Sequence, residues 1–136
     1  MLGTPVAAGA KERFDNDRVV ITSLIGDVAD RDIIVLDDEI ANGSTIIAIL
    51  ELLKDAGART VRVACTHGVF SNSAVNRIAA GPNVSEIITT DTVPLRDESR
   101  NPKLSVISVA AAFAEAVRRI HSGESVSVLF DPKHTA

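Results

Sequence analysis

Short runs of branched apolar residues alternate along this chain with segments whose apolar residues recur at helical spacing. Residues 33–36 are continuously apolar, as expected for a strand buried on both faces of a sheet. Strands are expected over Arg18–Ile25, 33–36, 61–65, 86–89 and Leu104–Ile107. Strands that alternate with helices favour parallel pairing through right-handed crossovers. We therefore predict an α/β fold, a parallel twisted sheet with helices on both faces.

Three helices are expected among these strands. The first follows residues 42–44 and ends at Gly57, a residue suited to a left-handed cap, and the second spans residues 73–80. The last helix has Ser108 as its predicted N-cap, with Arg118, Arg119 and His121 in its final turn. We expect the apolar faces to lie in the core. They comprise Ile46, Ile49, Leu50 and Leu53 in the first helix, and Val109, Ala112, Phe113, Ala116, Val117 and Ile120 in the last.

Composition narrows the function classes. The 136 residues are 46% hydrophobic and carry a formal net charge of −4, which favours one domain over residues 1–136 with its own core. A single cysteine excludes a disulfide framework, and neither a leader nor a long apolar run is evident, so we expect a cytoplasmic protein without a membrane partner. An acidic total with no Trp or Tyr argues against a nucleic-acid partner.

The acidic charge is concentrated in one stretch. Residues 30–39 hold five acids and one base, whereas the remaining acids and bases are equal in number. Like charges that lie close together repel one another unless something compensates them, so we expect the cluster to have a functional reason. The acids are Asp30, Asp32, Asp37, Asp38 and Glu39.

Two kinds of chemistry adjoin in residues 37–45, which follow a predicted strand and lead into a helix. The acids can accept hydrogen bonds from vicinal sugar hydroxyls or hold the waters of a Mg²⁺ ion. The step Gly43-Ser44-Thr45 offers backbone N–H groups, hydroxyls and a positive helix end to a phosphate. Together they suggest a sugar-phosphate site. The alternative is that the acids only end a strand and Ser44 only caps a helix.

Residues 33–45 resemble the phosphoribosyl-diphosphate signature of type I phosphoribosyltransferases and ribose-phosphate pyrophosphokinases: four apolar residues, two acids, and a loop ending Gly-x-Thr. Five further stretches are similar to the pyrophosphokinases in particular, so the resemblance covers nearly the whole chain. They are residues 10–13, 25–28, 64–71, 90–94 and 125–130.

This resemblance implies a type I phosphoribosyltransferase-like, Rossmann-like fold and the C-terminal half of an enzyme of nucleotide biosynthesis. That enzyme transfers diphosphate from ATP to the 1-hydroxyl of ribose 5-phosphate, forming phosphoribosyl diphosphate. By position, Asp37 and Asp38 would hold the ribose hydroxyls and a water-linked Mg²⁺. The 5-phosphate would bind at Asn42, Gly43, Ser44 and Thr45.

The resemblance also implies roles near the two ends of the chain. Lys11 and Arg13 match the Lys-x-Arg of a mobile catalytic loop, here at about residues 8–18, whose cations would neutralise charge on phosphate oxygens. Ser125, Ser127 and Phe130, in a tail of residues 122–136, match a segment near a regulatory phosphate site. Such enzymes form homo-oligomers, dimers grouped into hexamers. From the residues alone, Lys11 and Arg13 would belong to a solvated charged turn and the tail to an edge strand.

Two departures from the family pattern bear on activity. Ala41 stands where the family has an acid that helps to hold the sugar phosphate or assists the chemistry. The chain also resembles only the C-terminal half of the family's enzymes. In the family, the N-terminal half supplies much of the adenine site and a metal-binding histidine. We therefore expect sugar-phosphate binding with weak or no binding of ATP alone.

The remaining chemically active side chains have less specific expectations. His67 follows a predicted strand and either faces the same cleft or bonds to the backbone. Cys65, with no Cys or His partner at metal spacing, is expected in the core. His121 is expected at a helix end and His134 in a loose tail.

Three other function classes compete with the leading one. The chain could be a non-catalytic regulatory or assembly subunit, or a small phosphoribosyltransferase, for which Ala41 is a difficulty. A phosphoacceptor domain would explain acids after two strands, Asp37-Asp38 and Asp91. That class places its acid pair after the first strand and has no use for Gly43-Ser44-Thr45.

Overall fold

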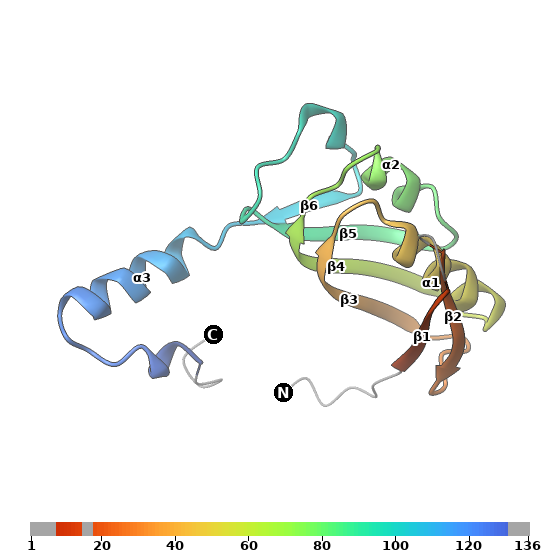
Figure 1. Ribbon diagram of the computed structural model, residues 1–136, viewed down its shortest axis with the longest axis horizontal. Helices are drawn as coiled ribbons and strands as arrows, with labels where there is room; N and C mark the ends of the chain where they lie inside the picture. The colour runs from red at the N-terminus through yellow and green to blue at the C-terminus, as the bar shows by residue number, and fades with distance from the viewer. Residues whose placement is uncertain (1–7, 15–17, 131–136) are drawn as a thin grey trace. The chain divides into compact units, whose positions relative to one another are not determined.

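The computed structural model describes residues 8–14 and 18–130, with the backbone alone as far as Ile25. Its elements fall into two compact units, within Pro5–Ile107 and within Ser108–Ala136 (Figure 1). The first contains β1 (Ala8–Phe14), β2 (Arg18–Ile25), β3 (Asp32–Ile40), α1 (Ser44–Asp55), β4 (Thr60–Gly68), α2 (Ala74–Ala79), β5 (Val84–Thr90), η1 (Asp97–Ser99) and β6 (Leu104–Ile107). The second contains α3 (Ala110–His121) and η2 (Ser127–Phe130).

A four-stranded parallel sheet organises the first unit. Its strands lie in the order β3-β4-β5-β6, so all four carboxyl ends meet at one edge (Figure 1). Alternate residues of β4, such as Val61 and Val63, are buried in one core with Leu50 and Leu53 of α1 and with Ile78 of α2. The α/β class and the parallel sheet are therefore confirmed, and the carboxyl edge is where such folds bind ligands.

The other face of the sheet is open within this unit. On β3, Ile34 is 56% exposed and Leu36 77% exposed, whereas the alternate residues Ile33 and Val35 are partly buried against the core. Side chains of successive strand residues point to opposite faces, which explains this alternation.

The N-terminal strands form a separate sheet. The expected strand Arg18–Ile25 is present as β2, but it pairs antiparallel with β1 and does not join the parallel sheet. Residues 8–14, expected to belong to a loop, form β1, while 15–17 lie outside the described residues.

Several elements have other bounds than expected, and β4 and β5 are both longer than the predicted strands. β3 extends to Ile40 because Asp37, Glu39 and Ile40 continue the pairing with β4, so the acid pair lies within the strand and not in a loop after it. The predicted N-cap Ser108 is wrong by one residue. Val109 is the N-cap of α3, and the Ser108 hydroxyl accepts the Ala110 N–H at 3.3 Å.

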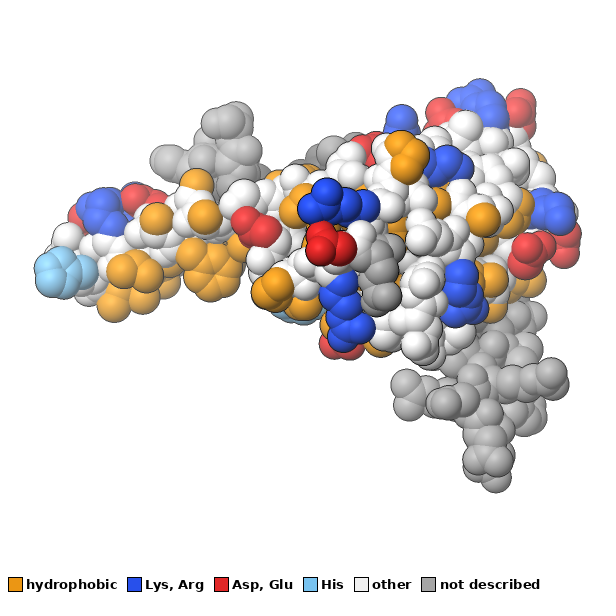
Figure 2. Space-filling model, turned by 90° about the horizontal axis from the view of Figure 1, so that it is seen from above, with side chains coloured by type: hydrophobic (Ala, Val, Ile, Leu, Met, Phe, Trp, Pro, Cys, Tyr) orange, Lys and Arg blue, Asp and Glu red, His pale blue; other side chains and the backbone are white. Residues whose placement is uncertain are grey.

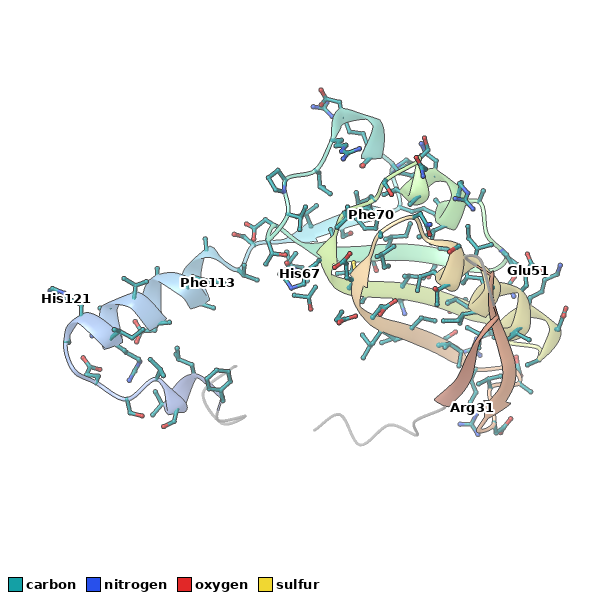
Figure 3. All side chains as sticks on the ribbon, in the orientation of Figure 1. Arg31, Glu51, His67, Phe70, Phe113 and His121 are labelled. Carbon is teal, nitrogen blue, oxygen red and sulfur yellow. The ribbon has the colours of Figure 1, made fainter. Side chains whose placement is uncertain are left out.

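The second unit exposes the apolar face of α3. Phe113, Val117 and Ile120 are 64%, 65% and 69% exposed. Phe113 is labelled on the helix in Figure 3, and Figure 2 shows hydrophobic side chains on the surface of this part of the chain. The expectation that the apolar face of α3 lies in a core is therefore wrong within the second unit. Beyond α3 the unit's described residues are 122–130, and they leave these three side chains more than half exposed. None of the described helices is long and apolar enough to cross a membrane.

Candidate functional site

A pocket of about 200 Å³ lies where β3 ends and α1 begins. It is lined by residues 37–46, so the structure gathers the predicted acids and the predicted phosphate-binding residues around one cavity. Pockets for drug-sized ligands have volumes of roughly 300–1,000 Å³, so this one suits a small ligand. The predicted residues that line it are Asp37, Asp38, Asn42, Gly43, Ser44 and Thr45.

The acidic stretch divides into two parts because β3 holds it extended. Asp32, about 16 Å from Asp37 at the strand rise of roughly 3.3 Å per residue, lies at the opposite end of β3. Arg59 donates to both carboxylate oxygens of Asp32, at 2.9 and 2.7 Å, and holds its pKa well below the usual range. Asp32 is therefore an ion-paired residue away from the pocket, and the pocket acids are Asp37, Asp38 and Glu39.

The two aspartates each bond to the next backbone amide. Oδ1 of Asp37 accepts the Asp38 N–H at 3.0 Å, and Oδ1 of Asp38 accepts the Glu39 N–H at 2.9 Å. Asp37 is half-buried, whereas Asp38 and Glu39 are exposed. These bonds orient the two carboxylates at the pocket wall, and Oδ2 of Asp38 has no partner among the described residues.

The start of α1 forms the other side of the pocket. Gly43 is the N-cap, with φ of 76°, and no side chain caps the helix, so Ser44 is not a capping residue. Oδ1 of Asn42 accepts the Ser44 N–H at 3.0 Å, which engages one amide expected to face a phosphate. In the described part of the chain the N–H groups of Gly43 and Thr45 have no partner, and they lie at the positive end of the helix dipole.

The carbonyl groups of the pocket loop are held from behind. The groups that hold them belong to residues 69–77, which run from the end of β4 into α2. Ile40 O accepts the N–H groups of Val69 and Phe70, both at 3.1 Å, and Ala41 O accepts that of Ser71 at 2.9 Å. Phe70, fully buried beside β4, has φ of 47°, a backbone strain that the surrounding contacts must hold in place (Figure 3).

Sequence reasoning missed one residue of this arrangement. Arg77 of α2 donates from Nη1 to the Asn42 carbonyl at 3.2 Å. The two residues are 35 positions apart, and no local motif relates them. The available signal was topological: α2 follows the strand that neighbours β3, so its side chains reach the pocket loop.

His67 is not among the residues that line the pocket. It lies exposed near the end of β4, and its Nδ1 is 2.9 Å from Thr92 Oγ1 (Figure 3). Thr90 and Thr92 both lie within hydrogen-bond distance of the Thr66 carbonyl, at 2.7 and 3.0 Å. This network ties the segment after β5 to the end of β4, so His67 has a structural partner next to the site.

Cys65 lies in the core, as expected. It is 7% exposed, and burial raises the pKa of its thiol. Among the described residues there is no group of three or more His, Cys, Asp or Glu side chains that could hold a metal ion directly.

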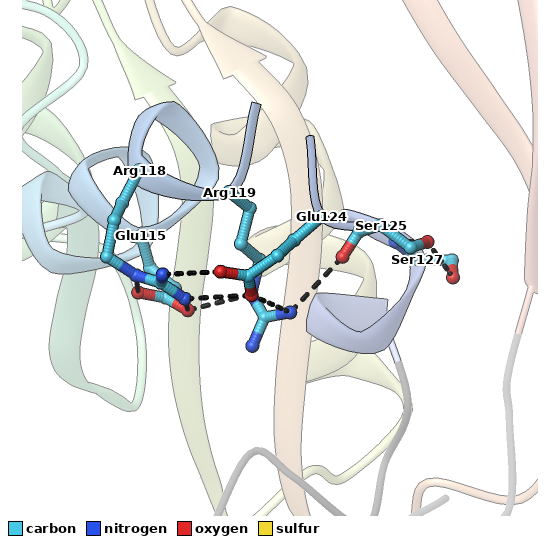
Figure 4. Close-up of polar contacts among 6 residues, drawn as sticks. All are labelled: Glu115, Arg118, Arg119, Glu124, Ser125 and Ser127. Carbon is cyan, nitrogen blue, oxygen red and sulfur yellow. Dashed lines mark hydrogen bonds and ion pairs between the residues drawn. The ribbon is translucent and has the colours of Figure 1, made fainter. Parts of the chain in front are cut away.

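The expected regulatory residues lie in the second unit. Oγ of Ser125 is 2.7 Å from Oγ of Ser127, and Phe130 is 83% exposed in η2, a 3-10 helix where the residues alone suggested an edge strand. Four charged residues of α3 and the following turn form a network of ion pairs beside them, and one donates to the Ser125 carbonyl at 3.3 Å (Figure 4). They are Glu115, Arg118, Arg119 and Glu124.

Three predicted or noted residues cannot be placed. The side chains of Lys11 and Arg13 lie outside what the structure describes, although their backbone belongs to β1. His134 lies beyond the described residues, whereas His121 ends α3 as expected.

Comparison with known proteins decides the family. Residues 13–131 match the family described as the phosphoribosyl synthetase-associated domain. The chain belongs to this family. A crystal structure of phosphoribosylpyrophosphate synthetase from Mycobacterium smegmatis superposes with a TM-score of 0.71 at 34% identity, over 80% of this chain and 35% of that one.

Curated relatives of this family member carry one enzyme name. A Streptomyces coelicolor protein named for ribose-phosphate pyrophosphokinase is 57% identical over 133 residues, 98% of this chain and 42% of the relative. The ribose-phosphate pyrophosphokinase of Campylobacter jejuni is 40% identical over 95% of this chain and 41% of its own length. The chain thus spans about two fifths of the length of these relatives.

Proposed function

We propose that this chain binds ribose 5-phosphate and phosphoribosyl diphosphate as the sugar-phosphate part of a ribose-phosphate diphosphokinase. The observation that carries the proposal is one pocket lined both by Asp37 and Asp38 and by Gly43 and Thr45, whose N–H groups have no partner among the described residues. In this proposal Asp37 and Asp38 accept hydrogen bonds from the ribose hydroxyls, and Asn42, Gly43, Ser44 and Thr45 surround the 5-phosphate.

Magnesium fits this pocket only through water. Three carboxylates line it, but Asp37 and Asp38 each use one oxygen on a backbone amide, and the described residues include no ready-made metal cluster. Mg²⁺ keeps several of its waters and binds through one or two carboxylates plus substrate phosphates, which matches such a donor set. The ion would supply positive charge to the diphosphate oxygens.

Diphosphoryl transfer from ATP is the fuller activity that we propose for the protein in its family setting. Lys11 and Arg13 would be the catalytic cations, because positioning and charge neutralisation carry most of phosphoryl-group chemistry. The enzyme names of the curated relatives support this reaction, and the chain spans about two fifths of their length. We expect weak or no binding of ATP by the chain alone.

Binding decides the first part of the proposal. In calorimetric titrations with MgCl₂ present, ribose 5-phosphate and phosphoribosyl diphosphate should bind. Asp38→Asn should weaken both by at least about tenfold, because a hydrogen bond to a charged group is worth about 1.5–3 kcal/mol. Asp55→Asn, at an exposed carboxylate that ends α1, should bind like the unchanged chain. Equal binding by Asp38→Asn and the unchanged chain would refute the site.

Catalysis separates this function from its alternatives. A coupled assay for AMP release should report turnover if the chain is an enzyme, whereas sugar-phosphate binding without AMP release favours a regulatory or assembly subunit. A small phosphoribosyltransferase would instead consume phosphoribosyl diphosphate when given a base. Ala41 disfavours that reaction, because it places no carboxylate where such enzymes have one.

Three further proposals accompany this one. A regulatory phosphate would bind near Ser125, Ser127 and Phe130, supported by the two guanidinium groups of the neighbouring ion-pair network. The protein would form homo-oligomers, supported by the exposed apolar side chains of both units. It would work in the cytoplasm, which fits a lone, buried and reduced cysteine.

A further inference from the structure

The peptide that joins Asn42 to Gly43 can in principle face either way. A peptide flip changes ψ of the first residue and φ of the second, and glycine accepts positive and negative φ at similar cost. Gly43 has φ of 76°, one of two orientations open to it. Backbone preference therefore does not decide which way this peptide points, and some contact outside the loop must.

Arg77 supplies that contact. Its Nη1 donates to the Asn42 carbonyl at 3.2 Å from α2, and Arg77 is not among the described residues that line the pocket. In a planar trans peptide the C=O of one residue and the N–H of the next point in opposite directions. Holding the Asn42 carbonyl toward α2 therefore turns the Gly43 N–H away from α2, at a residue that lines the pocket.

The same helix also supports Gly43 by packing. A Cβ built on Gly43 would lie 3.0 Å from Cδ1 of Ile78 and 3.4 Å from Cβ of Ala74. The loop thus rests on apolar atoms of α2, one turn of which also carries Arg77. Arg77 has no carboxylate partner among the described residues, so its charge acts on the carbonyl alone.

We propose that Arg77 is a positioning residue of the sugar-phosphate site, which directs the Gly43 N–H at the phosphate by holding the Asn42 carbonyl from behind. This inference rests on the proposed function and extends it to a residue outside the pocket.

Calorimetric titration of the full chain with two probes tests the proposal. The probes are ribose 5-phosphate and inorganic phosphate, each with MgCl₂ present. Arg77→Met should weaken both by about tenfold, the loss expected for one hydrogen bond from a charged donor. Arg77→Lys, which keeps the charge and a donor without the planar fork, should recover part of the affinity. Arg100→Met removes an exposed guanidinium paired with Asp97, away from the pocket, and should change nothing.

A spectroscopic signal distinguishes positioning from general support of the fold. In the unchanged chain the amide resonance of Gly43 should shift on adding inorganic phosphate, and in Arg77→Met this shift should be lost while the unfolding temperature stays the same. If Arg77→Met unfolds, Arg77→Gln gives the same comparison with a polar side chain in place.

The outcomes separate two failures. If the unchanged chain binds neither probe, the proposed function itself is wrong. If the unchanged chain binds and Arg77→Met binds equally well, or shows the same Gly43 shift, the role of Arg77 is wrong while the proposed function stands. Asp38→Asn provides the counterpart, because it should weaken ribose 5-phosphate but leave inorganic phosphate nearly unchanged.

Discussion

At the scale of single residues, the pocket depends on groups whose hydrogen bonds are already assigned. Asp37 and Asp38 each accept a backbone N–H with one carboxylate oxygen, and the side-chain oxygen of Asn42 accepts the Ser44 N–H. What is left for a ligand is a subset of the donors and acceptors that the sequence displays. The candidate site is therefore narrower than the signature suggests, with Gly43 and Thr45 as its open backbone donors.

Gly43→Ala tests how far the pocket depends on one backbone conformation. The substitution adds a Cβ at φ of 76° and 3.0 Å from Ile78, so both conformation and packing oppose it. Left-handed backbone costs a non-glycine residue about 1–2 kcal/mol, and we expect a loss of at least that size in urea unfolding. Gly123→Ala is the matched control, since Gly123 has φ of 69° and nothing within 4 Å of a built Cβ. A smaller loss at Gly43 than at Gly123 would contradict this account.

At the scale of elements, strand pairing and ion pairing stabilise segments whose residues have only weak secondary-structure propensity. β3 continues through three acidic residues, which are poor strand formers, because Asp37 and Glu39 pair in register with Cys65 and His67 of β4. α3 is stabilised by ion pairs. Glu115 pairs with Arg118 and Arg119, which lie one turn further along the helix, and an acid that precedes its base in this way is the favourable orientation.

The titration of Glu115 provides a test of this helix. Hydrogen bonding by Arg118 lowers the pKa of Glu115 from 4.5 to about 2. A carboxyl group whose pKa is depressed by folding stabilises the folded form above pH 4.5, and that contribution is lost as the pH falls from 4.5 toward 2. In carbon NMR the Glu115 carboxyl group should titrate near pH 2. Arg118→Met should move the midpoint up toward 4.5, whereas Arg100→Met should not. An unchanged midpoint in Arg118→Met would contradict the assignment.

The elements were largely predictable from the sequence, and the tertiary details of the site were not. The apolar run at residues 33–36 and the helical spacing before Gly57 mark β3 and α1 by local physics alone. The contact between Arg77 and Asn42 depends on two strands lying side by side, which no local pattern encodes. The bond from the Ser44 N–H to Asn42 is likewise invisible in a motif that only counts residue types.

At the scale of the whole molecule, the apolar surface is only partly covered within each unit. Leu36 and Ile34 of the sheet and Phe113 of α3 are more than half exposed. Exposed apolar surface of this extent is typical of surfaces that meet another protein surface. The amphipathic spacing in α3 predicts an apolar face correctly. Residues 108–130 do not supply the surface that would cover this face.

We predict that the chain associates with itself through this exposed surface. Sedimentation should show a species larger than one chain that grows with protein concentration. Leu36→Ser and Phe113→Ser should each weaken the association, because each removes about 1.5–3 kcal/mol of apolar burial. Arg100→Met, at an exposed charged residue, serves as the control. A chain that sediments as a monomer at every concentration, with or without these substitutions, would contradict the prediction.

The anchoring of the carbonyl groups of Ile40, Ala41 and Asn42 to residues 69–77 bears on how other members of the family are compared. Two homologues whose pocket-lining residues are identical can differ in ligand affinity if their sequences diverge in these supporting residues. Judging retained or lost activity by the visible lining alone would then misclassify them. A survey of natural variants should therefore score the scaffold behind the loop together with the loop.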